Sequence, residues 1–170
     1  MGVVVNSSEI KTKLLHYWRF TRNGYDYLAT EVGKFNSDVL VSNGKEIIEC
    51  EVKCSRADLR NDFKKTARSG TLKHSVYKKP STYYSQWLPN RFYFAVGKEL
   101  GEYALEMVSG TPYGVIEVSS NPFSNRKRDS YCLIVKKAGI IQPIFRKKLY
   151  RQIIMRESSE LIRLRIKLGQ

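Results

Sequence analysis

The sequence predicts an α/β (α+β) fold in which helices flank a β-sheet, and three observations support this prediction. Residues 8–21 carry apolar side chains at helical spacing, whereas residues 25–54 hold three short β-favouring segments separated by Gly and Asn. Both kinds of segment recur after residue 90, and the last is a helical pattern at 145–167. With 170 residues and a hydrophobic content of 42%, the chain can bury one core. We therefore expect a single domain over residues 1–170.

The first expected helix covers residues 8–21. Ser7 or Ser8 is suited to be its N-cap, and Asn23-Gly24 follows its end. The apolar stripe of this helix consists of Ile10, Leu14, Leu15 and Trp18.

Three strands are expected next, at residues 25–32, 37–41 and 46–54. Asn43-Gly44 is a strong hairpin signal, so the third strand should return antiparallel to the second. Side chains alternate between the two faces of a strand. In the third strand the charged residues Glu49, Glu51 and Lys53 therefore share one face, and Cys50, Val52 and Cys54 share the other.

A second helix is expected from Ser55, because Ser55 and Asp58 have the spacing of a capping box. Its buried stripe would be Leu59, Phe63 and Ala67. Residues 69–90 show weak periodicity and read as a long loop rich in lysine and aromatic residues. Either these side chains contact nucleic acid, through ring stacking and phosphate pairing, or the aromatic rings anchor the loop on the core.

The rest of the chain continues the alternation of strands and helices. The expected strands are 91–96, 113–119 and 131–137, and the expected helices are 98–108 and 145–167. Residues 162–168 also alternate at strand period, but the preceding stretch 157–160 favours a helix. Arg126, Lys127 and Arg128 lie in an expected basic loop at 121–129.

The charge balance points to an anionic partner. Thirty Lys and Arg residues against 16 Asp and Glu residues give a net charge of +14. Nucleic acid is the commonest partner of so basic a chain, although some membrane-surface and thermophile proteins are basic too. The segment from Arg56 to Lys79 contains eight lysine and arginine residues but only two aspartates. We expect nucleic-acid contacts from this segment, made by Arg56, Arg60, Lys64, Lys65, Lys73, Tyr77, Lys78 and Lys79.

Other compositional features argue against a secreted or membrane protein. The three cysteines, Cys50, Cys54 and Cys132, are an odd number without a Cys-x-x-Cys pair, so neither a disulfide framework nor a zinc knuckle is expected. Cys50 and Cys54 read as small core residues. No apolar run approaches the ~20 residues of a transmembrane helix, and no secretion signal is evident. We therefore expect a cytoplasmic protein with no membrane partner.

Acidic residues on the expected strands suggest a site. Asp38 lies on the second strand, and after twelve intervening residues Glu51-Val52-Lys53 lies on the third. Burying two carboxylates and an ammonium on one strand face is costly unless they are compensated. A divalent cation and a phosphate would compensate both signs of charge. These groups, facing a cavity open to solvent, would suit metal-assisted phosphodiester cleavage.

This pattern resembles the PD-(D/E)xK nuclease superfamily, whose motif lies on a hairpin of a central mixed sheet. Ser37 replaces the proline of the motif. The residues from Ser55 to Lys65, and Phe92 to Val96, are similar to a small DNA-repair-associated branch of that superfamily. The resemblance covers about residues 8–97, and strands and a helix at about 112–168 would complete the domain. It implies a restriction-endonuclease-like fold.

The resemblance also implies roles for individual residues. Asp38 and Glu51 would ligate Mg²⁺, for which Mn²⁺ could substitute, with the main-chain carbonyl of Val52 as a further ligand. Lys53 would face the attacking water. Neighbouring carboxylates favour protonated Lys53, so we expect it mainly to orient the water and stabilise the transition state. Glu31 is a candidate supporting carboxylate, with Glu9 as its rival.

Glu49 shares the strand face of Glu51 and Lys53, so three readings of it stay open. Glu49 would form an ion pair with Lys53, ligate a second metal ion, or face solvent without a role in the site.

Three functions follow from these features. The leading hypothesis is an Mg²⁺-dependent endonuclease that cleaves DNA rather than RNA, and a homodimer would be needed to cut both strands. The second is a non-catalytic nucleic-acid-binding protein that keeps the nuclease fold. The third is a basic scaffold for an acidic protein partner.

Overall fold

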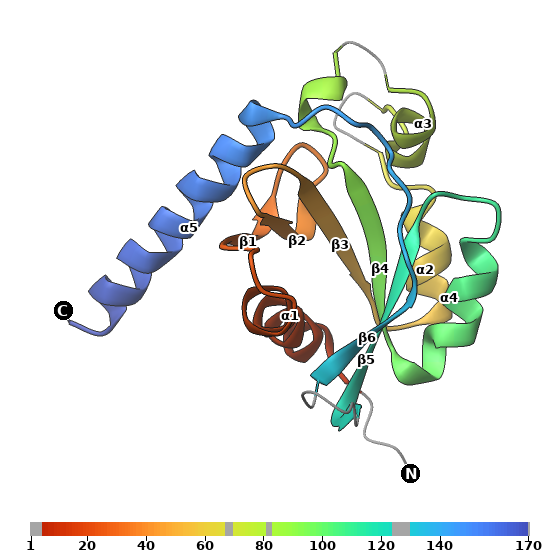
Figure 1. Cartoon of the computed structure of the whole chain (residues 1–170), viewed down its shortest axis with the longest axis horizontal. Coiled ribbons are helices and arrows are strands. Elements are labelled where there is room, and N and C mark those ends of the chain that lie inside the picture. The colour runs from red at the N-terminus through yellow and green to blue at the C-terminus, as the bar shows by residue number, and fades with distance from the viewer. Residues whose placement is uncertain (1–4, 67–69, 81–82, 124–129, 170) are drawn as a thin grey trace.

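One six-stranded mixed sheet forms the centre of the molecule, with helices on both faces (Figure 1). The computed structural model describes residues 5–66, 70–80, 83–123 and 130–169. The strands lie side by side in chain order, and β3, β4 and β5 run parallel while their neighbours pair antiparallel. They are β1 (Tyr27–Val32), β2 (Ser37–Ser42), β3 (Ile47–Lys53), β4 (Arg91–Gly97), β5 (Gly114–Phe123) and β6 (Ser130–Lys136). The predicted α+β class is confirmed.

Helix α1 (Ser7–His16) covers one face of the sheet and continues as a π-helix over Tyr17–Thr21. This confirms the helix predicted at 8–21, but its N-cap is Asn6 rather than a serine. The Asn6 side chain accepts a hydrogen bond from Glu9 N at 2.9 Å. The apolar stripe of the helix packs against β2, β3 and β4 through Ile10, Leu14, Trp18, Val39, Cys50 and Tyr93.

Shorter helices cover the opposite face (Figure 1). They are α2 (Arg56–Asp62), α3 (Lys73–Lys78) and α4 (Gly101–Met107), the last preceded by a 3-10 turn at Lys98–Leu100. Ser55 caps α2, as predicted, by accepting a hydrogen bond from Asp58 N at 3.1 Å. Leu59 of α2 is buried here with aromatic residues of β4. This second core explains why Phe92 and Phe94 point away from α1.

The hairpin between β2 and β3 fixes which residues of these two strands lie opposite each other. Ser42 pairs with Ile47 and Val39 with Cys50, so residues 43–46 form a four-residue connection. Gly44 adopts a positive φ of 81°, and the Asn43 side chain accepts hydrogen bonds from two following main-chain N–H groups. All seven residues of β3 are buried, including its three charged ones.

Helix α5 (Lys147–Lys167) packs its first half beside β1 and then extends away from the sheet (Figure 1). Leu149 and Ile153 are buried, whereas Leu164 and Ile166 in the second half are more than half exposed. The predicted helix at 145–167 is confirmed over nearly its full length. Among the described residues, no helix combines the length and the apolar character needed to cross a lipid bilayer.

Two expectations about residues 69–90 and the cysteines are wrong. The segment read as a long loop contains α3 and a 3-10 turn at Ser85–Trp87, because buried polar and aromatic side chains hold α3 against the sheet. Cys54 is exposed just beyond the end of β3, although Cys50 and Cys132 are buried as free thiols. Ala67 and the basic residues 126–128 lie outside the described residues.

Candidate active site

Asp38 lies at the end of the β2–β3 hairpin, one residue beyond the last paired residues. Its Oδ2 atom accepts a hydrogen bond from the main-chain N–H of Val52 at 2.9 Å. Its Oδ1 atom forms an ion pair with Lys11 Nζ on α1, also at 2.9 Å. The side chain is 22% exposed. The Asp38 carboxylate is thus fixed beside β3, with one oxygen held by the backbone and the other by a lysine.

Glu51 is buried on the side of β3 that faces α2 and α3. Its Oε1 atom contacts Lys65 Nζ at 2.7 Å and Lys53 Nζ at 3.1 Å, and its Oε2 atom contacts Lys73 Nζ at 2.9 Å. Burial alone would raise the pKa of Glu51, but the three lysines outweigh it and lower that pKa overall. Glu51 is therefore ionised at neutral pH despite being only 2% exposed.

Lys53 is held between two carboxylates. Its Nζ atom lies 2.7 Å from Asp62 Oδ1 as well as near Glu51. Burial would lower the pKa of Lys53, but the charges of Glu51 and Asp62 raise it overall. The neighbouring carboxylates thus favour protonated Lys53, as the sequence predicted, and its Nζ atom donates a hydrogen bond to Glu51.

Asp62 connects Lys53 to a buried polar chain. Its Oδ2 atom is 2.8 Å from His74 Nε2, and His74 Nδ1 is 2.9 Å from the Tyr113 hydroxyl. Desolvation works against ionised Asp62, but the hydrogen bond with His74 and the nearby lysines lower its pKa overall. The chain fixes the orientation of Asp62 and, through it, of Lys53.

Glu49 is also buried, so the reading in which it faces solvent is wrong. Its Oε1 atom lies 2.7 Å from Lys73 Nζ, and its Oε2 atom accepts a hydrogen bond from the Tyr77 hydroxyl. Burial would lower the pKa of the fully buried Lys73, but Glu49 and Glu51 together raise it. Lys73, rather than Lys53, is therefore the cation that neutralises Glu49.

The structure brings Asp38, Glu51 and Lys53 to the same end of one hairpin but does not expose all three to solvent. Asp38 is partly exposed, whereas Glu51 and Lys53 are buried. The expectation of a shared cavity open to solvent is wrong, because Lys65 and Lys73 pack against Glu51. In the described ranges, no three His, Cys, Asp or Glu side chains are arranged to hold a metal ion.

Glu31, the candidate supporting carboxylate, is linked to Asp38 through a shared lysine. Lys11 Nζ lies 3.4 Å from Glu31 Oε1 and 2.9 Å from Asp38 Oδ1. Glu31 has a positive φ of 55° at the end of β1, and its side chain is 54% exposed. Its rival Glu9 pairs with Lys13 on its own helix. The geometry thus favours Glu31 over Glu9 as the carboxylate near Asp38, and its catalytic role stays a prediction.

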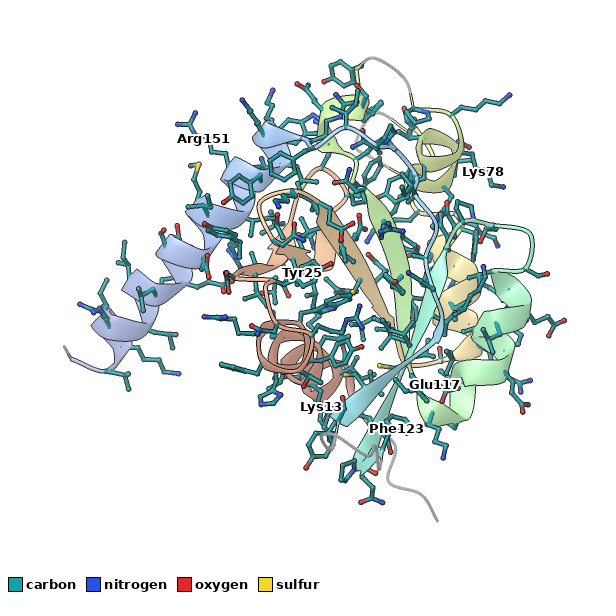
Figure 2. All side chains as sticks on the ribbon, viewed as in Figure 1. Lys13, Tyr25, Lys78, Glu117, Phe123 and Arg151 are labelled. Atoms are coloured by element: carbon teal, nitrogen blue, oxygen red, sulfur yellow. The ribbon has the colours of Figure 1, made fainter. Side chains whose placement is uncertain are left out.

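The residues predicted to contact nucleic acid divide into two groups. Lys73 and Tyr77 are buried on the inner side of α3, so the expectation that they contact nucleic acid is wrong, and the Tyr77 ring instead packs in the core, as the alternative reading expected. Arg56, Arg60 and Lys64 are exposed on or next to α2, and Lys65 is partly exposed. Lys78 and Lys79 are exposed at the end of α3, with Lys78 at the periphery of the molecule (Figure 2). Only this second group is available to a polyanion.

Sequence reasoning did not single out Asp62, Lys11 or His74 as site residues. A signal for Asp62 was present, because it follows Leu59 by three residues and therefore shares the buried face of α2. No comparable signal exists for Lys11, which reaches Asp38 from a helix more than twenty residues earlier in the chain.

No family model, curated protein or solved structure matches this chain. A functional assignment therefore depends on the residues and contacts of the site itself.

Proposed function

We propose that this protein is a metal-dependent nuclease with a restriction-endonuclease-like fold, acting on phosphodiester bonds in DNA. One observation carries the proposal. The hydrogen bond from Val52 N–H to Asp38 fixes the first carboxylate of the motif next to Glu51 and Lys53, at 2.9 Å from the β3 backbone. The motif thus lies on a hairpin of a mixed sheet, as the resemblance to PD-(D/E)xK nucleases implies.

The chemistry of the donor set fits a magnesium ion. Asp38 Oδ1, Glu51 Oε1 and the Val52 carbonyl are all oxygen donors, which Mg²⁺ prefers. The N–H and C=O of one strand residue point to the same neighbouring strand, so the Val52 carbonyl lies on the Asp38 side of β3. Bound Mg²⁺ would lower the pKa of a water molecule and neutralise charge on the phosphate.

Lys53 would supply a fixed positive charge near the reacting phosphate. Its raised pKa keeps it protonated, and Asp62 and Glu51 restrict the direction in which its N–H groups point. A cation positioned in this way stabilises negative charge as it develops in the transition state.

The exposed face of α2 would bind the DNA backbone. Arg56 and Arg60 are exposed, and so is Lys64, two residues beyond the end of the helix. The Arg56 guanidinium lies 4.9 Å from the ring centre of Tyr103, which restrains it without covering it. These cations lie beside the end of β3, so a bound strand would pass close to Asp38 and Lys53.

A cleavage panel tests this proposal. Wild type with Mg²⁺ or Mn²⁺ is incubated with duplex, single-stranded and flapped DNA and with RNA, and EDTA is added as a control. We expect metal-dependent cleavage that Asp38→Asn, Glu51→Gln and Lys53→Met each reduce at least a hundredfold. Asp26→Asn is the matched control, because Asp26 is an exposed carboxylate paired only at the surface with Arg19. Equal cleavage by wild type and Lys53→Met would refute the assignment.

A second function is favoured by the ion pairs around Glu51. Three lysines already neutralise Glu51 and its neighbours, which suits a protein that keeps the nuclease fold but only binds nucleic acid. Such a protein would bind DNA with strong salt dependence and without turnover. Salt-sensitive binding together with no cleavage by any divalent metal would support this function over the first.

A further inference from the structure

We propose that Lys65 and Lys11 are displaceable cations, which hold the outward oxygens of Glu51 and Asp38 until a divalent metal ion takes their place. The released ammonium groups would then bind substrate phosphates beside the metal. This inference rests on the proposed nuclease function and identifies two residues outside the motif that control metal binding.

The two oxygens of each carboxylate have different kinds of partner. The inward oxygens are held by groups that cannot leave, since Glu51 Oε2 contacts fully buried Lys73 at 2.9 Å and Asp38 Oδ2 accepts a hydrogen bond from the backbone. On the outward side, Lys65 Nζ lies 2.7 Å from Glu51 Oε1, which Lys53 Nζ also contacts at 3.1 Å, and Lys11 Nζ lies 2.9 Å from Asp38 Oδ1. The outward oxygens are therefore the ones that a metal ion can reach.

Exposure separates the displaceable lysines from the fixed ones. The side chains of Lys65 and Lys11 are 29% and 20% exposed, against 8% for Lys53 and 0% for Lys73. An ammonium at the protein surface regains its hydration by moving a short distance into water. A fully buried ammonium can leave its carboxylates only if the surrounding structure opens.

The backbone of Lys65 stays in place when its side chain moves. Lys65 N donates a hydrogen bond to Asp62 O at 2.9 Å, and Lys65 O accepts one from Lys73 N at 2.9 Å. Lys11 has a second carboxylate within reach, because Glu31 Oε1 lies 3.4 Å from its Nζ atom. Each lysine can thus release its metal-ligating partner without disturbing the sheet.

Charge balance also favours replacement of the Lys65 ammonium by the metal ion over binding of the ion with Lys65 still in place. Around Glu51, the described carboxylates Glu49, Glu51 and Asp62 face the ammonium groups of Lys53, Lys65 and Lys73, so the charges cancel. A divalent ion would therefore meet no net charge on the Glu51 side of the site. Departure of Lys65 leaves one net negative charge, which attracts the ion.

A Mn²⁺ titration in the absence of substrate tests the inference directly. Binding is measured by calorimetry or by loss of the free-Mn²⁺ paramagnetic resonance signal for wild type, Lys65→Gln, Lys11→Gln and Lys65→Arg. We expect about tenfold tighter Mn²⁺ binding in each glutamine variant, the effect of removing one competing charge near the protein surface. Lys65→Arg keeps the charge and should bind Mn²⁺ as wild type does.

Lys45→Gln is the matched control, because it removes the same charge from an exposed residue at the opposite end of the hairpin. Its Mn²⁺ affinity should equal that of wild type. Short DNA duplexes in Ca²⁺ should bind more weakly to Lys65→Gln than to Lys45→Gln, since the released ammonium is missing. Thermal melting checks that each variant folds.

The results separate failure of the inference from failure of the function. If wild type cleaves DNA and binds Mn²⁺, but Lys65→Gln binds it no more tightly than Lys45→Gln, the displacement is refuted and the nuclease function stands. If none of the variants binds Mn²⁺ and wild type does not cleave, both are refuted. Weaker Mn²⁺ binding in Lys65→Gln would also refute displacement, because it would make Lys65 a support for the site.

Discussion

Replacing Lys73 by Met tests the central claim that buried ion pairs hold the site together. Lys73 is fully buried, and its Nζ atom lies 2.7 Å from Glu49 and 2.9 Å from Glu51. Met keeps most of the apolar stem, so the variant loses the charge rather than the packing. Removing one partner from a buried ion pair typically costs about 3–5 kcal/mol, because an uncompensated charge remains. We expect a loss in this range, a large share of the roughly 5–15 kcal/mol that stabilises a domain.

Urea unfolding at several pH values measures this loss and identifies its cause. In wild type the pKa of Glu51 is lowered, so its stabilising contribution is present above the unfolded pKa of about 4.3 and is lost as the pH falls. Without Lys73, less positive charge opposes the burial of Glu51, so its pKa should be lowered less and its stabilising contribution should shrink. The difference between wild type and variant should therefore be largest at pH 7 and shrink toward pH 4.

Two further variants make the experiment decisive. Lys73→Met combined with Glu49→Gln should recover part of the loss at pH 7, because one buried charge has been removed. Lys45→Met, at an exposed turn residue, should change stability by no more than about 0.5 kcal/mol. A cost below about 1 kcal/mol for Lys73→Met, or a cost independent of pH, would refute the electrostatic account.

Three more predictions concern acid stability, DNA binding and thiol reactivity. Because the pKa of Asp62 is lowered in the folded state, wild type should lose stability as the pH falls below about 4, and Asp62→Asn should lose less over that range, as followed by thermal melting. Arg60→Gln should weaken duplex binding and lower the magnitude of the slope of log affinity against log salt by about one. Tyr77→Phe should leave that slope unchanged, because Tyr77 is buried. In the native protein, a maleimide should modify Cys54 quickly and Cys50 and Cys132 only on unfolding; comparable rates for all three thiols would contradict the described burial.

The local pattern of the sequence was sufficient to predict most of the fold. Apolar residues at helical spacing gave α1, and alternating residues with Asn43-Gly44 between them gave the β2–β3 hairpin. The capping box at Ser55 placed the start of α2. These features are encoded by neighbouring residues, so they can be read before any long-range contact is known.

Helix α3 could not be predicted in this way. It has six residues and no side-chain N-cap, and a helix of this length is not stable by itself. It forms because Lys73 and His74 meet Glu49, Glu51 and Asp62 across the core. Lys73, which the sequence analysis expected to contact nucleic acid, is buried by these contacts.

The sequence by itself determined that Asp38, Glu51 and Lys53 would lie on adjacent strands, because strand period and a hairpin turn are local properties. Only the tertiary structure decided which cations neutralise them. Lys11, Lys65 and Lys73 come from three segments separated along the chain, and their ammonium groups meet the carboxylates only after the helices pack on the sheet. Electrostatic pairing depends on distance in space and on burial, neither of which is written in the spacing of residues along the chain.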